Sequence, residues 1–163
     1  FNLEKTFHRI TDGFFSTDEN ESAETSENEI SITIDSMDDI DDAIAFMPDL
    51  PVPEYIPEGF ELEELKVSKF MNGSYAVNYV YNNEDDAYLM ITSKQTDENG
   101  AHAGLTMASK VIQSGKRDIH YYEDSYTNTN NASFLMNNQL IDIAGNIDQI
   151  EMIKIAEKIC FKN

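Results

Sequence analysis

The sequence has only one cysteine, few basic residues and no long apolar run, and each of these features excludes something. A single cysteine, Cys160, cannot form a disulfide within the chain. No apolar run approaches the roughly 18 residues of a membrane-spanning helix, so we expect none here. Only 11 lysines and arginines face 31 acids, a net charge of −20. We therefore expect no binding to nucleic acid or to anionic membrane surfaces, which requires basic residues.

What the chain does contain is enough for one folded domain. Its 163 residues are 40% hydrophobic and 10% aromatic, which is typical of a single domain with a core. The first residue is Phe1 rather than methionine. We expect a signal sequence or membrane anchor upstream of Phe1 in the native chain.

Acidic residues concentrate in the N-terminal part. Residues 10–65 contain no lysine or arginine and hold 18 of the 31 acids, which leaves 13 acids against 11 bases elsewhere. We therefore expect the folded remainder to be nearly neutral. Residues 16–29 contain one alanine and no other apolar residue, too little to offset the entropy of ordering. We interpret residues 16–29 as an acidic linker, either a spacer or a segment that binds a basic partner or loosely held divalent cations.

On either side of this linker the pattern predicts structure. Apolar residues at intervals of three and four from Leu3 to Phe14 predict a helix over residues 1–15, either docked on the domain or emerging from a membrane. After the linker, residues 30–163 are expected to form a single α+β domain. It begins with strict alternation over residues 29–35, which predicts a half-buried strand.

A short helix and a proline-rich strap are predicted next. Apolar residues recur at helical spacing from Ile40 to Met47, and Pro48 should end this helix. The aspartates at its start resemble a calcium loop, but the glycine and glutamate of an EF-hand are missing, so favourable charge at a helix start explains them better. Residues 48–60 hold all four prolines and should run extended, laying Tyr55 and Ile56 on the core.

The strap also carries a family resemblance. Residues 53–60 read PEYIPEGF, tyrosine-rich strands follow, and residues 141–146 read IDIAGN before a predicted helix. In these features, over roughly residues 36–160, the chain resembles the family called domain of unknown function 4367. The resemblance implies an extracytoplasmic domain of Gram-positive bacteria, mostly clostridia and bacilli, often behind a membrane segment or lipoprotein signal and in some members linked to anti-sigma-factor-like regulators. It implies no catalytic residues.

The rest of the chain predicts an antiparallel, meandering sheet with a C-terminal helix packed on one face. Short polar turns between the predicted strands leave no room for helical crossovers. Asn72-Gly73 predicts a hairpin with positive φ at both residues, and a β-bulge is predicted at Glu63-Glu64, where the alternation slips. Later strands are predicted over residues 107–114, 118–123, 125–129 and 132–144, the last split by a turn at Asn137-Asn138.

The C-terminal helix is predicted to begin at Asn146, as its N-cap. Its apolar face consists of Met152, Ile153, Ala156, Ile159 and Cys160. We expect Cys160 to be a small buried hydrophobic residue rather than a nucleophile, because no histidine lies near it in the sequence.

No motif for catalysis or metal binding is found. His8, His102 and His120 lack metal-ligand spacing, and neither a phosphate-binding loop nor a GxSxG elbow is present. Acid pairs such as Asp85-Asp86 fall in predicted turns. We expect no catalytic residue, no metal, no cofactor and no enzymatic activity.

Tyrosines provide the one candidate binding surface. All eight lie between Tyr55 and Tyr126. A sheet covered on one face by a helix can present such rings on the other, where tyrosine combines contact area with a hydrogen-bonding tip. The alternative is that they occupy strands because they pack well there. The candidate binding residues are Tyr79, Tyr81, Tyr121, Tyr122, Lys116 and Arg117.

These observations favour a non-enzymatic, extracytoplasmic binding or sensing domain of a membrane-anchored bacterial protein. Its partner would be an unknown protein or small ligand, with the acidic linker as a spacer from the anchor. An alternative is a carrier of an apolar ligand or lipoprotein between sheet and helix, which predicts an apolar cavity on the order of several hundred Å³. An enzyme would require titratable groups that converge in a cleft.

Overall fold

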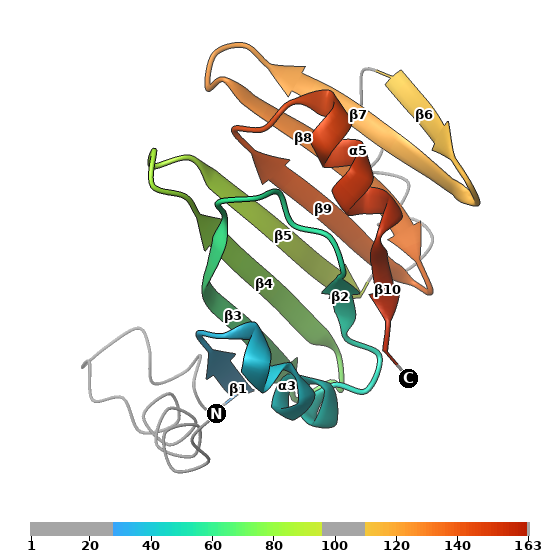
Figure 1. Ribbon diagram of the computed structural model, residues 1–163. Helices are drawn as coiled ribbons and strands as arrows, with labels where there is room; N and C mark the ends of the chain where they lie inside the picture. The colour runs from blue at the N-terminus through green and yellow to red at the C-terminus, as the bar shows by residue number, and fades with distance from the viewer. Residues whose placement is uncertain (1–27, 96–109, 163) are drawn as a thin grey trace.

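The computed structural model describes residues 28–95 and 110–162, and their dominant feature is one large antiparallel sheet (Figure 1). Two short helical segments and a small ribbon lie on one face of it. This is the predicted α+β class, with a C-terminal helix on one face and a short helix before the strap. The predicted helix at residues 1–15, residues 16–27 of the predicted linker, and residues 107–109 of the strand predicted over residues 107–114 fall outside the described parts.

The large sheet has eight strands. They are β1 (Glu29–Ile34), β3 (Glu61–Phe70), β4 (Tyr75–Asn82), β5 (Tyr88–Gln95), β6 (Lys110–Ser114), β7 (Arg117–Asp124), β8 (Thr129–Met136) and β9 (Gln139–Gly145). The remaining elements are a 3-10 turn η1 (Met37–Asp39), helix α3 (Ile40–Phe46), helix α5 (Gln149–Glu157), and a ribbon of β2 (Pro51–Pro53) with β10 (Ile159–Phe161).

The sheet consists of two meanders joined along a seam. Strands β3, β4 and β5 are neighbours in sequence order, and so are β6, β7, β8 and β9, whereas β5 pairs with β9. The chain therefore leaves β5 in the middle of the sheet, resumes at the far edge with β6 and winds back (Figure 1). The antiparallel arrangement is confirmed, but the single meander that short turns suggested is divided in two by this seam.

Local turn predictions are mostly confirmed. The register between β3 and β4 shifts between Leu62 and Glu64, at the predicted bulge. Asn72-Gly73 lies in the β3–β4 hairpin, but only Gly73 has positive φ, so the predicted type I′ turn is wrong in detail. Asn137 and Asn138 both have positive φ and join β8 to β9. The predicted strand at residues 125–129 is wrong, because residues 125–128 form the turn before β8, which begins at Thr129.

We call the face of the sheet covered by α3, α5 and the β2–β10 ribbon the inner face. The core fills the space between this face and the elements that cover it. Helix α5 contributes Met152, Ile155 and Ala156. Its N-cap is Asp148, whose side chain accepts from Glu151 N–H at 2.8 Å, and not Asn146 as predicted. The helix ends at Glu157, so Cys160 belongs to β10 and is only partly buried.

The strap begins extended, as predicted, and its first residues are bound to the rest of the fold, whereas its end forms a turn in which Phe60 N–H donates to Pro57 O at 3.2 Å. All three residues of β2 are buried. Tyr79 Oη donates to Pro51 O at 2.7 Å, and Gln139 Nε2 donates to Asp49 O at 3.0 Å. Backbone pairing with β10 then links the strap to the end of α5.

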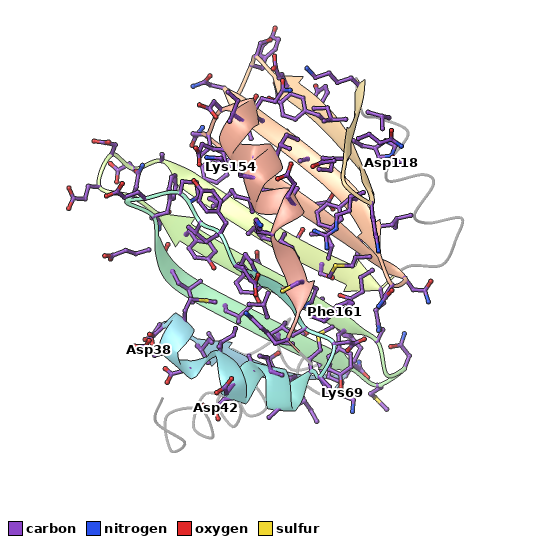
Figure 2. The ribbon with its side chains drawn as sticks, turned by 45° about the vertical axis from the view of Figure 1, so that its right-hand side comes forward. Asp38, Asp42, Lys69, Asp118, Lys154 and Phe161 are labelled. Carbon is purple, nitrogen blue, oxygen red and sulfur yellow. The ribbon has the colours of Figure 1, made fainter. Side chains whose placement is uncertain are left out.

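The folded part is itself acidic, which corrects the expectation of a nearly neutral domain. Residues 28–95 and 110–162 carry 22 acids and 9 lysines and arginines. Residues 10–65, which lack lysine and arginine, include α3, the strap and the start of β3. The acidic stretch therefore extends from the linker into the folded domain. Figure 2 shows Asp38 and Asp42 on the outside of the η1–α3 segment.

Candidate functional site

Three of the predicted site tyrosines lie in the core. Tyr79, Tyr81 and Tyr121 are 0%, 2% and 0% exposed, on the inner face of β4 and β7. Their hydroxyls donate to Pro51 O, Met37 Sδ and Glu123 Oε1, respectively. The expectation that these rings lie on an exposed surface is therefore wrong. Alternation shows which residues share a face of a sheet, but not which face the helices will cover.

Arg117 is held inside the protein's own fold. Its guanidinium donates to Ala156 O in the last turn of α5 and to Ile159 O in β10, and lies 4.8 Å from the Phe134 ring centroid. Partial burial lowers the pKa of Arg117, because desolvation disfavours the charged form. The bond to Ala156 O satisfies a carbonyl that the helix end leaves without an intrahelical partner. Arg117 thus ties β7 to α5 and β10.

Lys116 occupies a different place from the tyrosines. It lies in the tight turn between β6 and β7 and lines a hollow of about 420 Å³ together with Ser114, Gly115, Arg117 and Glu157. Ser114 Oγ donates to Glu157 in this hollow. The six predicted binding residues therefore do not form one site. Of the four tyrosines, Tyr122 alone is exposed.

Tyr122 belongs to the outer face, the side of the sheet opposite α5 and the strap. A row of polar residues crosses this face, each directly paired with the next across six adjacent strands. In the strand order β3, β4, β5, β9, β8 and β7, the row consists of Lys66, Asn78, Thr92, Asp142, Ser133 and His120. Ser133 Oγ donates to Asp142 Oδ1, and the buried Oδ1 of Asn78 has no hydrogen-bond partner among the described residues.

Exposed apolar side chains surround the β7 end of this row. Val111 pairs directly with His120 and is 57% exposed, while Tyr122 and Leu135 are 43% and 46% exposed. We call Val111, His120, Tyr122, Ser133 and Leu135 the outer-face site. The face is not exposed throughout, since Ser68 and Leu140 on it are buried.

Sequence reasoning found only Tyr122 of this site. The others come from three strands, and their proximity depends on pairing register. Composition and spacing along the chain carry no signal for that register.

The chemistry of the outer-face site suits recognition better than catalysis. Asp142, Ser133 and His120 include the residue types of a hydrolytic triad, but Ser133 donates to the carboxylate and no hydrogen bond joins it to His120 in the described structure. Strands β8 and β9 have neighbours on both sides, so their backbone N–H groups are used in the sheet. These strands therefore offer no backbone donors for an oxyanion.

Other chemical candidates are weaker. Within residues 28–95 and 110–162, no group of three or more His, Cys, Asp or Glu is placed to bind a metal. Burial, with a contribution from Glu54, raises the pKa of the Cys160 thiol, which disfavours the nucleophilic thiolate. An open pocket of about 630 Å³ has mostly acidic and amide side chains. It is lined by Glu58, Gly59, Glu61, Leu62, Glu63, Asn82, Asn83, Glu84 and Asp85.

The apolar cavity that a carrier requires is not found between α5 and the sheet in the described parts. Tyr121, Phe134, Met152 and Ile155 fill that space and are fully buried. The hollow beside Lys116 and the open acidic pocket both lie elsewhere.

The architecture defines a class of small α+β domain, an antiparallel sheet closed on one face by a proline-rich strap and a C-terminal helix. The family described as a domain of unknown function, DUF4367, matches residues 50–159, and the chain belongs to this family. The matched range runs from the strap to β10 and includes the whole outer-face site. No curated protein matches the chain. No described helix is long and apolar enough to cross a membrane.

Proposed function

We propose that the chain is a non-enzymatic binding or sensing domain, the extracytoplasmic part of a membrane-anchored protein of a Gram-positive bacterium. The observation that carries the binding role is the outer-face site, where polar groups on adjacent strands lie beside three exposed apolar side chains. Exposed apolar and aromatic side chains next to hydrogen-bonding groups are typical of recognition surfaces. The location is supported by the family resemblance alone.

Site-directed photocrosslinking tests both parts of this proposal. A photoreactive phenylalanine analogue replaces Tyr122 in the full-length protein, expressed in the bacterium that encodes it, and the cells are fractionated after illumination. We expect the protein in the membrane fraction, with its domain accessible from outside, and one dominant crosslinked species at Tyr122.

The matched control places the same analogue at Ile150, which is exposed on α5 on the other side of the molecule. Equal crosslinking at Tyr122 and Ile150 would contradict a binding role for the outer face. Recovery of the intact protein from the cytosol would contradict the proposed location.

A further inference from the structure

Strand β6 is a sheet edge whose backbone is available for pairing. It pairs with β7 only. A two-residue turn, Gly115-Lys116, joins the strands, which makes Ser114 and Arg117 a hydrogen-bonded pair. Because such pairs alternate along an antiparallel ladder, the N–H and C=O groups of Val111 and Gln113 point away from β7. Groups of this kind form a template for another strand.

Side-chain contacts of β6 do not cover this edge in the described parts of the chain. Lys110 and Ser114 hydrogen-bond to Gln149 and Glu157 of α5, on the inner face of the sheet. Strand β6 contains no proline and no bulge, which are common devices for blocking an edge. Among the described residues, the outer edge of β6 is therefore open to addition.

The sequence of β6 is complementary to itself. Two β6 strands that pair antiparallel about an axis at Ile112 place Val111 opposite Gln113 of the second copy. Both residues turn their free backbone groups outward, so each pair can exchange two hydrogen bonds. Lys110 falls opposite Ser114, so no like charges face each other. Lys110 Nζ also turns back onto its own subunit, 2.9 Å from Gln149 Oε1 and 5.1 Å from the Tyr121 ring centroid.

We propose that two copies of this chain associate through β6, antiparallel about a two-fold axis at Ile112, to form one continuous sheet. The outer-face site lies at this edge, and pairing places Val111 of each copy beside Gln113 of the other. The partly exposed apolar group of Val111, Tyr122 and Leu135 would then continue into the second copy. This inference does not depend on the proposed binding function.

Sedimentation equilibrium of the full chain over a wide concentration range tests the association. We expect a reversible dimer. In Val111→Pro the dissociation constant should rise about tenfold or more, because two backbone bonds are lost across the axis. Proline is tolerated on an edge strand whose N–H faces solvent, so the monomer should keep its circular dichroism spectrum.

Val111→Thr is the matched control, because it keeps both the backbone N–H and the strand propensity, and it should dimerise as the parent does. A monomer at every concentration would overturn the proposal, and so would a Val111→Pro variant that dimerises normally. If the chain were monomeric at every concentration, the β6 edge would be available to a strand of a different protein.

Disulfide trapping tests the register. In a Cys160→Ser background, Ile112→Cys should give covalent dimers on mild oxidation, because directly opposed residues of a non-hydrogen-bonded pair have Cα atoms about 4.5 Å apart. Gln113→Cys should give few, since the two Gln113 residues are offset along the strands by more than a disulfide spans. Equal trapping at both positions, or none at Ile112→Cys, would overturn this mode of pairing.

Discussion

Tyr79 is a polar residue at the centre of the core, and its hydroxyl has a defined task. The side chain is fully buried, and its Oη donates to Pro51 O of the strap at 2.7 Å. Burial raises the pKa of Tyr79, so the phenol remains a donor. The Tyr79 ring therefore packs in the core while its hydroxyl holds the strap, a segment with little regular hydrogen bonding of its own.

Removing this hydroxyl should destabilise the fold. In Tyr79→Phe the Pro51 carbonyl stays buried without its donor, and we expect the free energy of unfolding to fall by about 1–2 kcal/mol. Urea denaturation followed by circular dichroism measures it. Tyr122→Phe, on the exposed outer face, should change stability by less than about 0.5 kcal/mol. Equal effects of the two substitutions would contradict the role of Tyr79.

For single residues, the sequence predicted which side chains share a face of a strand better than whether that face is buried. Alternation correctly placed Tyr79 and Tyr81 on one face of a strand. It could not indicate that this face is covered, because that depends on elements distant in the chain. Grouping Tyr122 with Tyr121 was an error of a different kind, because alternation itself places neighbours in a strand on opposite faces.

Among the elements, α5 depends on β7 for its C-terminal end. The helix has nine residues, and Arg117 donates to the Ala156 carbonyl in its last turn and to the Ile159 carbonyl in β10. Figure 2 shows the helix, with Lys154, above the end of β10 at Phe161. A helix this short gains most of its stability from packing and capping rather than from intrinsic propensity.

Loss of the Arg117 donors should loosen α5 and β10. Arg117→Met keeps an unbranched apolar stem beside Phe134 but leaves the carbonyls of Ala156 and Ile159 unpaired, and we expect a loss of about 1.5–3 kcal/mol. Amide hydrogen exchange should be accelerated most in α5 and β10. Lys116→Met removes the same charge from the adjacent exposed position and is expected to leave exchange unchanged. Accelerated exchange spread evenly over the sheet would contradict this local role.

The boundaries of helices and strands were predicted correctly where residues only a few positions away determine them. The strand at residues 29–35, the end of α3 before Pro48 and the β8–β9 turn all follow from residues within a few positions. Strand β10 was missed because three residues carry no periodicity. Its identity as a strand depends on the strap that it pairs with, roughly a hundred residues away.

Across the whole molecule, the buried tyrosines make the fold sensitive to alkaline pH. Tyr79 and Tyr81 lie in one meander and Tyr121 in the other, and burial raises the pKa of all three, that of Tyr121 to about 12. Tyrosine in an unfolded chain has a pKa of about 10. Above that pH the unfolded state loses protons that the folded state keeps, so stability is full below pH 10 and falls as pH rises.

Urea denaturation at stepped pH values measures this effect. The free energy of unfolding should decrease between about pH 10 and pH 12. Tyrosinate absorbance from the core rings should appear together with the loss of the folded circular dichroism signal. Replacing Tyr121 by phenylalanine should reduce the slope. A free energy that stays constant over this interval would contradict the burial of these phenols.

At the scale of the whole chain, the class of fold was predictable and the seam was not. Short turns and alternation imply an antiparallel sheet. Strand β5 pairs with β9 because these are the edges left free once both meanders have formed. The residues near β5 do not indicate this partner. The outer-face site lies within the second meander, so its assembly depends on that same long-range arrangement.

The seam also has a consequence for the order of folding. Each meander closes through hairpins between neighbouring strands, whereas the β5–β9 ladder joins residues roughly fifty positions apart. Long loops are slow to close, so the two meanders should form first and dock last. Until they dock, Leu89 and Ile91 of β5 and Ile143 of β9 lie on unpaired edges. The rate of that docking step therefore sets how long the nascent chain is exposed to aggregation.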